Sequence, residues 1–528
     1  MTLLRLAALG VLLLGAAPLC AQQRADSTAP PVIRGVIIDR RDIFEPEETR
    51  ASSLARFGNA IHTTTRRRVI ERELLFAPGE PFDSAKVAET ARNLRALGIF
   101  RRVLIDSIHT DSGTVLRVTT KDGWSTRPQF DFNSTGGQTA WSVGLQELNL
   151  FGNAAVGAIS YANTPDRTAV TLSFYQPRLI ANRVYVSAGY QHRSDGRSFS
   201  AGVGQPFFSY ASRAGLTVGA VDFDGDVLRF FNGNPVAGQV LRRRYDLVRA
   251  DGALALAASP HAFVRLGFLA QVRRDDFLDT SLVAATPFPR SVSGAAGPYL
   301  WLNRASFIVV HNYRSFAREE DVDLSPVLFV GTYATPHAFG YDRDGVGLQG
   351  NLGAGLRTPG GFVTLGASAS GRVTSAGLDS GTVRVTGRWL VQPSRVQSLV
   401  VLGQLGWQKN PAPGDEFDLG LSRGPRAFYA HAFTGDRFVN LLVEYRWTAI
   451  EDLWDALGLG FATFVDHGGA WYAGSPRRTG TDVGWGVRLG PSRGTDTDAV
   501  ISIDLARRFQ TDVQSAGWSI VVRRGVRF

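Results

Sequence analysis

Two neighbouring segments in the last quarter of the chain alternate strictly between apolar residues and polar or small ones. One row holds Val439, Leu441, Val443, Tyr445 and Trp447, followed by Leu457, Leu459, Phe461 and Val465. The opposite row includes Glu444, Arg446 and Asp466. Successive side chains of a β-strand point to opposite faces. An apolar face opposite charged residues is typical of a membrane-spanning β-barrel, whose apolar face meets lipid and whose polar face lines the lumen.

The same period of two recurs in short segments from Arg127 onward, separated by Gly, Pro, Asn and Asp. Each segment is a weak signal, but its repetition predicts an all-β transmembrane antiparallel barrel over residues 125–528. Between about sixteen and twenty strand segments can be counted, a range that bacterial barrels allow. The count is least secure in residues 225–345. Long polar stretches there, at 232–241, 273–295 and 313–323, are predicted to be surface loops.

The N-terminal residues have the features of a secretory signal peptide. Arg5 precedes an apolar run from Leu6 to Leu14, and small residues lie near the expected cleavage site after Ala21. The alternative is a lipoprotein that begins at Cys20. We therefore expect a signal peptide over residues 1–21 and a flexible leader over residues 22–31. Cys20 is the sole cysteine, so the mature chain is expected to have no disulfides or thiolate metal sites.

Residues 32–122 differ in pattern from the rest of the chain. A strand is predicted at 32–39 and a helix at 63–76. A second helix is predicted to begin after Asp83 and to end at Gly98, and two strands follow at 102–107 and 114–120. The predicted order β-α-α-β-β makes a small α+β domain in front of the barrel.

Other functional classes find little support. The net charge of +10 comes almost wholly from arginine, but these residues are scattered along an exported chain, so a nucleic-acid partner is not expected. Gly420–Gly424 matches G-x-S-x-G without the strand and helix that a nucleophile elbow needs. Gly345–Gly350 matches G-x-G-x-x-G with no helix after it. We predict neither catalysis nor a cofactor nor a metal.

Four short motifs resemble those of the BamA/TamA-type superfamily of outer-membrane assembly barrels, which includes the transporters of two-partner secretion. They are Arg426-Ala427-Phe428, Gly435-Asp436-Arg437, Glu444-Tyr445-Arg446 and Phe464-Val465-Asp466-His467-Gly468. The family has glycine after the loop arginine, where this chain has Ala427. The resemblance implies sixteen strands and a location in the bacterial outer membrane.

The resemblance also implies that an inward loop is locked in the lumen by Arg426. Glu444 and Asp466 are its expected acidic partners, since guanidinium offers a planar fork of donors to carboxylate oxygens. Phe464 is expected to pack against the loop tip. Phe428 and Gly468 complete the predicted lock residues. The alternative is a set of unrelated lumen charges.

Two further segments carry the resemblance. Residues 78–105, with Gly98-Ile99-Phe100, are similar to the polypeptide-transport-associated (POTRA) repeat, and one such repeat is recognisable. This implies a periplasmic N-terminal domain in which Gly98 and Phe100 belong to the motif. The last strand, with Trp518 and the terminal Phe528, is similar to the signal by which outer-membrane barrels are recognised for insertion.

The function that the resemblance implies is assistance in the insertion, assembly or translocation of other polypeptides. A weak seam between the first strand (127–134) and the last (516–528) could open and offer unpaired backbone groups to an incoming strand. The expected partners are unfolded outer-membrane or secreted β-rich polypeptides, outer-membrane lipid, and periplasmic chaperones or accessory subunits. Two alternatives remain: an exporter of one partner protein, and a passive porin-like or structural barrel. The sequence does not identify the clients.

Overall fold

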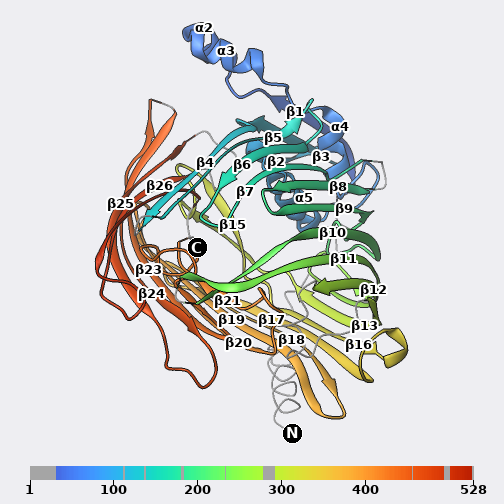
Figure 1. Cartoon of the computed structure of the whole chain (residues 1–528). Coiled ribbons are helices and arrows are strands. Elements are labelled where there is room, and N and C mark those ends of the chain that lie inside the picture. The colour runs from blue at the N-terminus through green and yellow to red at the C-terminus, as the bar shows by residue number, and fades with distance from the viewer. Residues whose placement is uncertain are drawn as a thin grey trace.

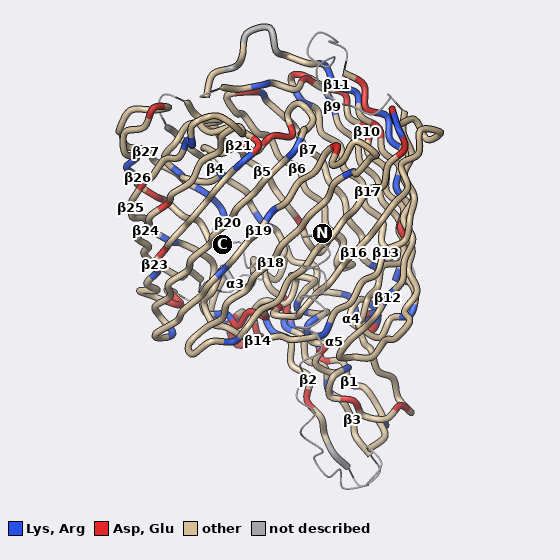
Figure 2. The backbone as a smooth tube through the Cα atoms, turned by 90° about the horizontal axis from the view of Figure 1, so that it is seen from below, with Lys and Arg blue, Asp and Glu red and all other residues tan. Residues whose placement is uncertain are grey.

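The computed structural model describes residues 31–525, apart from positions 111–112, 136–137, 180–182, 232, 278–291, 422, 455 and 493–499. The predicted signal peptide, almost all of the predicted leader, and Phe528 lie outside the described residues. The described chain forms a small module, residues 31–125, and a barrel that begins at Thr126. Figure 1 shows the barrel strands arranged in a ring, and Figure 2 shows the module at one end of it. We call this end the module end and the opposite one the far end.

The module contains a three-stranded sheet with β3 in the middle, parallel to β1 and antiparallel to β2. Its elements are β1 (Ile33–Arg41), α2 (Pro46–Ala51), α3 (Ser53–Ile61), α4 (Arg67–Glu73), α5 (Ser84–Ala96), β2 (Phe100–Thr110) and β3 (Gly113–Asp122). Asp83 caps α5, as predicted, by accepting hydrogen bonds from two backbone N–H groups of the first turn. Both predicted helices are present, as α4 and α5, but the predicted number of helices is wrong, because α2 and α3 also lie in the module. The extra pair starts at Pro46, where Glu45 and Glu48 form a reciprocal capping box.

The hydrophobic core of the module continues into the barrel wall. Leu148 and Ala154 of the barrel belong to the same buried cluster as Ile33, Ile70, Leu94, Phe100 and Leu116 of the module. Beside this core, the buried carboxylate of Asp122 accepts hydrogen bonds from the backbone N–H and Oγ1 of Thr65, at 2.7 and 2.9 Å. His62 Nε2 lies 2.9 Å from the same carboxylate. A buried carboxylate requires such partners, so this network ties α4 and its preceding loop to the chain that enters the barrel.

The barrel closes with 20 antiparallel strands. In chain order they are β4 (Thr126–Thr135), β5 (Gln138–Leu150), β6 (Ala155–Asn163), β7 (Thr168–Gln176), β8 (Tyr185–Arg193), β9 (Gly196–Gln205), β10 (Ala214–Phe231), β11 (Asn234–Ala258), β12 (Ala262–Phe277), β13 (Val292–Arg304), β16 (Val327–Thr335), β17 (Gly345–Thr358), β18 (Gly361–Thr374), β19 (Gly377–Ser394), β20 (Gln397–Lys409), β23 (Arg437–Leu453), β24 (Leu457–Trp471), β25 (Gly480–Pro491), β26 (Ile501–Arg508) and β27 (Gly517–Arg524). Strand β27 pairs with β4 and closes the ring.

The implied count of about sixteen strands is therefore wrong. Much of the predicted loop at 232–241 is strand, because β11 begins at Asn234, and β12 extends to Phe277. The charged residues beside these stretches can lie in strands because they are paired between neighbouring strands. Arg242 lies 2.6 Å from Asp224, for example, and Arg243 lies 2.8 Å from Asp275.

The two faces of the barrel wall differ as the alternation predicts. On β23, Glu444 and Arg446 are buried on the inner face, whereas Tyr445 and Trp447 are exposed on the outer face. Exposed apolar side chains continue around the ring, among them Leu172, Leu216, Leu266, Leu352, Leu365, Phe461, Ile503 and Ile520. An apolar outer surface of this extent is the surface that a lipid-embedded barrel presents.

Among the described residues, no helix is both long and apolar enough to cross a bilayer.

Two short hairpins do not belong to the barrel wall. One is β14 (Phe307–His311) with β15 (Glu319–Asp323), and the other is β21 (Phe417–Leu419) with β22 (Phe433–Gly435). Figure 1 shows both inside the ring of strands. The predicted surface loop at 313–323 is thus an inward segment, whose Tyr313 and Phe316 are buried. A single 3₁₀ turn, η1 (His337–Phe339), follows β16. We call residues 410–436, which contain β21 and β22, the lock loop.

Candidate functional site

Four adjacent strands, β23 to β26, present charged side chains to the lumen. Glu444 and Arg446 come from β23, Asp466 from β24, Arg488 from β25 and Asp504 from β26. All of these side chains are buried, while the alternating residues of the same strands are largely exposed and apolar. The inner wall therefore offers three carboxylates and two guanidinium groups in one place.

Arg426 of the lock loop inserts its guanidinium among these groups. Its Nε and Nη2 donate hydrogen bonds to the two carboxylate oxygens of Asp466, at 2.6 and 3.1 Å. Nη1 donates to Asp504 at 2.8 Å, and Nη1 and Nη2 each donate to Glu444 Oε2 at 3.3 Å. The Arg426 side chain is 1% exposed. The structure thus brings the predicted cation and both predicted acids together, in the bidentate geometry that suits guanidinium.

The neighbouring arginines share the same carboxylates. Arg446 Nε donates to Glu444 Oε1 at 2.8 Å. Arg488 lies 3.1 Å from Glu444 Oε2 and 2.6 Å from Asp504 Oδ1. Together with Arg426 and Asp466, the six side chains carry equal numbers of positive and negative formal charges. Burial of an uncompensated charge costs several kcal/mol, so this balance is what allows the group to lie in the interior.

The sequence analysis did not identify Asp504, Arg488 or Asp482 as parts of the site. Asp482 contributes by accepting a hydrogen bond from the backbone N–H of Ala427 at 2.9 Å. All three residues occupy inward positions of alternating strands. That alternation was a usable signal for Asp504, which lies between Ile503 and Leu505, both on the outward face of β26. Which inward charges meet the loop depends on strand register, which the alternation does not specify.

Two aromatic rings hold the loop against the wall, Phe464 on β24 and Phe428 in the loop itself. The guanidinium carbon of Arg426 lies 3.4 Å from the centroid of the Phe464 ring, a cation–π arrangement. Phe428 is fully buried, and its ring packs toward β25. Glycines make room for both rings. A Cβ at Gly484 would lie 2.4 Å from Phe464, and a Cβ at Gly480 would lie 2.3 Å from Phe428.

Ala427 occupies the position where the resembling family has glycine. Its φ is not in the positive region, so a methyl group brings no backbone strain there. The methyl group belongs to a small buried cluster with Phe464 and Ala506. The backbone carbonyl accepts hydrogen bonds from Ser519 Oγ at 3.1 Å and from Arg508 Nη1 at 3.3 Å. The loop tip is thus attached to the last two strands of the barrel.

The remaining predicted residues lie away from this cluster. Gly468 lies on β24, and a Cβ there would come within 2.9 Å of the side chain of Asn440. Trp518 is 56% exposed on β27, and its predicted companion Phe528 lies outside the described residues. Gly98 ends α5 with a φ of 68°, and Phe100 is fully buried in the module core.

The seam between β27 and β4 is short. The described residues pair at Ile520–Ser134, Val521–Asn133 and Val522–Phe132, whereas β27 pairs with β26 at eight positions and β4 with β5 at ten. In the described part of the chain, this junction thus has fewer paired positions than the junctions on either side of it.

The lock loop bridges that seam through one backbone oxygen. The carbonyl of Leu421 accepts a hydrogen bond from Asn133 Nδ2 on β4 and another from Arg523 Nη2 on β27, both at 2.6 Å. On the neighbouring strand β5, Gln138 Oε1 accepts a hydrogen bond from the backbone N–H of Ala430 at 3.0 Å. We call the contacts of the Leu421 carbonyl the seam latch.

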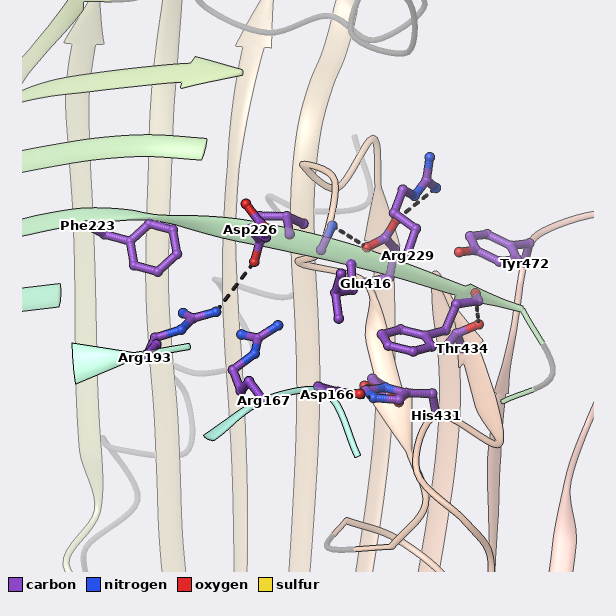
Figure 3. A pocket seen from close by; sticks show the side chains of 15 residues that line it. Asp166, Arg167, Arg193, Phe223, Asp226, Arg229, Glu416, His431, Thr434 and Tyr472 are labelled. Atoms are coloured by element: carbon purple, nitrogen blue, oxygen red, sulfur yellow. Dashed lines mark hydrogen bonds and ion pairs between the residues drawn. The ribbon is translucent and has the colours of Figure 1, made fainter. Parts of the chain in front are cut away.

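The base of the lock loop is attached to the far end of the barrel by His431. Its Nδ1 lies 2.5 Å from Asp418 and its Nε2 lies 2.9 Å from Asp166 in the β6–β7 turn. Its ring stacks on Phe230 at 3.5 Å. Burial by itself lowers the pKa of His431, but the two carboxylates outweigh burial and raise the pKa to about 9. Figure 3 shows His431 and Asp166 at the edge of a cavity of about 270 Å³.

The two enzyme-like motifs lie in a turn of the lock loop and in the barrel wall. Gly420 and Arg423 close a tight turn within the lock loop. Gly345–Thr358 is one continuous strand of the wall, paired on both sides. Within the part of the chain that the structure describes, no group of three or more His, Cys, Asp or Glu side chains is placed to hold a metal ion.

Comparison with known proteins gives likenesses in structure. No family model matches this sequence, and no curated protein matches it. Among solved structures, BamA from Haemophilus ducreyi lacking POTRA domains 1–3 is 12% identical, with a TM-score of 0.39 and coverage of 95% of this chain and 86% of that one. CdiB from Escherichia coli is 13% identical, with a TM-score of 0.44 and coverage of 98% and 95%. The FrpB iron transporter from Neisseria meningitidis is 7% identical, with a TM-score of 0.40 and coverage of 78% and 84%.

Proposed function

We propose that this protein is an outer-membrane barrel that assists the insertion, assembly or translocation of other β-rich polypeptides. The observation that carries the proposal is the short seam between β27 and β4 together with the seam latch that spans it. Among the described residues this junction has three paired positions, and a barrel that needs only to stay closed gains nothing from so short a seam.

The seam supplies the chemistry of the proposed reaction. When β27 and β4 separate, backbone N–H and C=O groups of both strands lose their partners, and an incoming strand can satisfy them by adding to the edge. Neither a nucleotide nor a cofactor enters this scheme. The driving free energy comes from the client, which buries its own apolar face in lipid as it folds.

The lock loop supplies the control of the seam. Arg426 fixes the loop tip in the lumen, and the same loop carries the Leu421 carbonyl that contacts both edge strands. Displacement of the guanidinium from its carboxylates would withdraw the latch as well. The proposed order of events is therefore release of the lock, loss of the latch, and opening of the seam.

The module is proposed to be a POTRA-like receptor in the periplasm. Strands β1 and β2 form the two edges of its sheet, and an edge strand can bind an extended peptide through backbone hydrogen bonds. The proposed partners are unfolded outer-membrane or secreted polypeptides, with periplasmic chaperones or accessory subunits delivering them, and outer-membrane lipid around the barrel.

A reversible crosslink across the seam tests the proposal. In a Cys20→Ser background, Phe132→Cys with Val522→Cys places two cysteines opposite each other in the seam. The matched control, Leu352→Cys with Ala367→Cys, joins β17 to β18 within the wall. The host strain is depleted of the native chain, and the abundance of its other outer-membrane barrels is measured.

We expect depletion to lower the abundance of other barrels. The control crosslink should restore it, and the seam crosslink should restore it only after reduction. If the oxidised seam variant is fully active, the seam is not the route. If depletion leaves other barrels unchanged but stops secretion of one partner protein, the chain is an exporter, and if neither changes, it is a passive barrel.

A further inference from the structure

The connection between β13 and β16 differs from a simple turn. Residues 305–326 form the β14–β15 hairpin, in which Phe307 pairs with Asp323 and His311 pairs with Glu319. Figure 1 shows this hairpin inside the ring, and Figure 2 shows it at the module end. Neighbouring connections at this end are tight, such as the turn that Ser259 and Ala262 close. A short link would have sufficed, so the inward hairpin calls for an explanation.

The hairpin reaches far around the inside of the ring. It leaves the wall between β13 and β16, and its tip reaches β24 and β25. Around the ring, β17, β18, β19, β20 and β23 lie between β16 and β24. The segment therefore lies inside the lumen over several strands of the wall, against which its body packs.

The tip is anchored in a bare patch of the wall on β24 and β25. Phe316 is 6% exposed. A Cβ at Gly458 would lie 2.2 Å from its ring, one at Gly490 would lie 3.0 Å away, and one at Gly460 would lie 3.4 Å away. Three inward glycines on two adjacent strands thus form a niche for the ring, because glycine has no side chain to fill that space. We call it the glycine niche.

The body of the hairpin packs on the inner wall. Val310, Tyr313 and Leu324 form one buried cluster with the inward side chains Phe362, Leu390, Val400, Leu402 and Leu442. Glu320, which is 3% exposed, accepts hydrogen bonds from the backbone N–H groups of Arg314 and Ser315 at 2.8 and 3.0 Å. This carboxylate fixes the turn that presents Phe316.

One arginine connects the hairpin to the lock. Arg446 Nη1 donates a hydrogen bond to the backbone carbonyl of Tyr313 at 2.8 Å, and its Nε donates to Glu444 at 2.8 Å. Glu444 also accepts from Arg426 of the lock loop. The segments that enter the lumen from the two ends thus meet through a single pair of wall residues, Arg446 and Glu444.

The module holds the other side of the hairpin. Arg95 on α5 makes a bidentate ion pair with Asp321, at 2.7 and 3.1 Å. The guanidinium carbon of Arg92, on the same helix, lies 4.4 Å from the centroid of the Phe307 ring. Arg95 and Asp321 are 31% and 22% exposed. Partly exposed ion pairs are weaker than the buried contacts of the tip, so this is the side that releases first.

We propose that residues 305–326 are a gate of the lumen at the module end. The gate is held shut by Phe316 in the glycine niche and by α5 through Arg95, and its opening turns the lumen into an aqueous passage. This inference goes beyond the proposed function, because it concerns passage through the lumen, whichever polypeptide the seam receives.

Single-channel conductance of the full chain in a planar bilayer tests the gate. We expect Phe316→Ser and Gly458→Val to raise the mean conductance several-fold, because both remove the tip from its niche. Gly403→Val is the control, since a Cβ at Gly403 meets no atom within 4 Å. Arg95→Glu should increase the open probability, and the charge swap Arg95→Glu with Asp321→Arg should restore it. Unchanged conductance in variants that remain folded would overturn the gate.

If these variants do not fold, a reversible disulfide that holds the gate shut provides a second test. In a Cys20→Ser background, Phe316→Cys with Gly458→Cys brings two sulfurs together, because a Cβ at Gly458 lies 2.5 Å from the Cβ of Phe316. The spacing in disulfides is about 3.8 Å, so a small shift of the tip suffices. The oxidised protein should conduct poorly, and reduction should raise conductance several-fold. Equal conductance before and after reduction means that the hairpin is no gate.

Discussion

The guanidinium carbon of Arg426 lies 3.4 Å from the centroid of the Phe464 ring. The cation is therefore covered on one face by an aromatic ring, while its N–H groups meet carboxylates at the edge. A lysine can provide the charge but neither the planar stacking nor the fork of donors. The shape of the Arg426 side chain therefore matters as much as its charge.

Arg426→Ala should destabilise the folded barrel by about 3–5 kcal/mol, the usual cost of leaving buried charges without their partner. Arg426→Lys should recover only part of the loss. The measurement is the urea midpoint of the folded form, detected by its altered mobility on unheated gels. Arg423→Ala is the matched control, because Arg423 is exposed in the same loop and its loss should change little.

Asp504→Asn should lower the stability of the folded barrel about as much as removal of the predicted acids Glu444 or Asp466 would. The reason is that Asp504 neutralises both Arg426 and Arg488. Arg488→Gln with Asp504→Asn keeps the cluster neutral, so the double variant should lose less stability than the two single variants added together. Asp512→Asn serves as the control, since Asp512 is 59% exposed in its ion pair. Strict additivity at positions 488 and 504 would argue against a shared cluster.

Gly480→Ala should displace Phe428 and loosen the lock loop, because the added Cβ would lie 2.3 Å from the ring. The expected readout is faster protease cleavage within residues 410–436 in the folded protein. Gly403→Ala provides a comparison with nothing within 4 Å of the added atom, and its cleavage rate should match that of the native chain. Equal rates in both variants would show that the ring tolerates the methyl group.

Asn133→Ala should weaken the seam latch, since the Leu421 carbonyl then keeps only the hydrogen bond from Arg523. Loss of one buried hydrogen bond costs about 1 kcal/mol. The measurement is amide hydrogen exchange in β4 and β27, which should become faster while exchange in β17 and β18 is unchanged. Asn351→Ala, at an exposed position of β17, is the control for asparagine removal.

The His431 clamp should make the lock loop sensitive to alkaline pH. The folded pKa of about 9 lies above the ordinary value of 6.5. The stabilisation is therefore fully present below about pH 6.5 and is lost as the pH rises through 9. A shift of this size corresponds to at most about 3 kcal/mol. Protease cleavage within residues 410–436 should increase between pH 7 and pH 10 in the native chain.

The control for that pH dependence is His431→Gln, which cannot gain a proton. Its cleavage rate should already be high at pH 7 and should change little up to pH 10. A native chain whose cleavage rate does not respond to pH would show that the contacts with Asp166 and Asp418 do not hold the loop in solution.

Much of the barrel was predictable because period-two alternation is a local property. Trp447 and Glu444 could be assigned to opposite faces from their positions alone, and the structure places them there. The strand count was not predictable in the same way. Residues 232–241 and 273–295 were predicted to be loops from their polar composition, whereas β11 and β12 extend into them and their charged residues pair between strands.

The helices of the module also show that only features encoded by neighbouring residues could be predicted from the sequence. Asp83 predicted the start of α5, because helix capping depends only on residues within one turn. The pair α2 and α3 carries its own start signal at Pro46, which the sequence analysis did not use. The inward course of residues 305–326 has no local signal of this kind, because Phe316 finds its glycines on strands that lie far along the chain.

The sequence by itself determined that inward charges oppose an outward apolar face, and that Arg426 has Glu444 and Asp466 as candidate partners. Alternation and charge can both be read from the sequence one residue at a time. Only the tertiary structure decided that Asp504 and Arg488 complete the cluster, that Leu421 spans the seam, and that a hairpin folds into the lumen. Those relationships depend on strand register and ring closure, which bring residues from distant segments within a few ångströms and which no local pattern encodes.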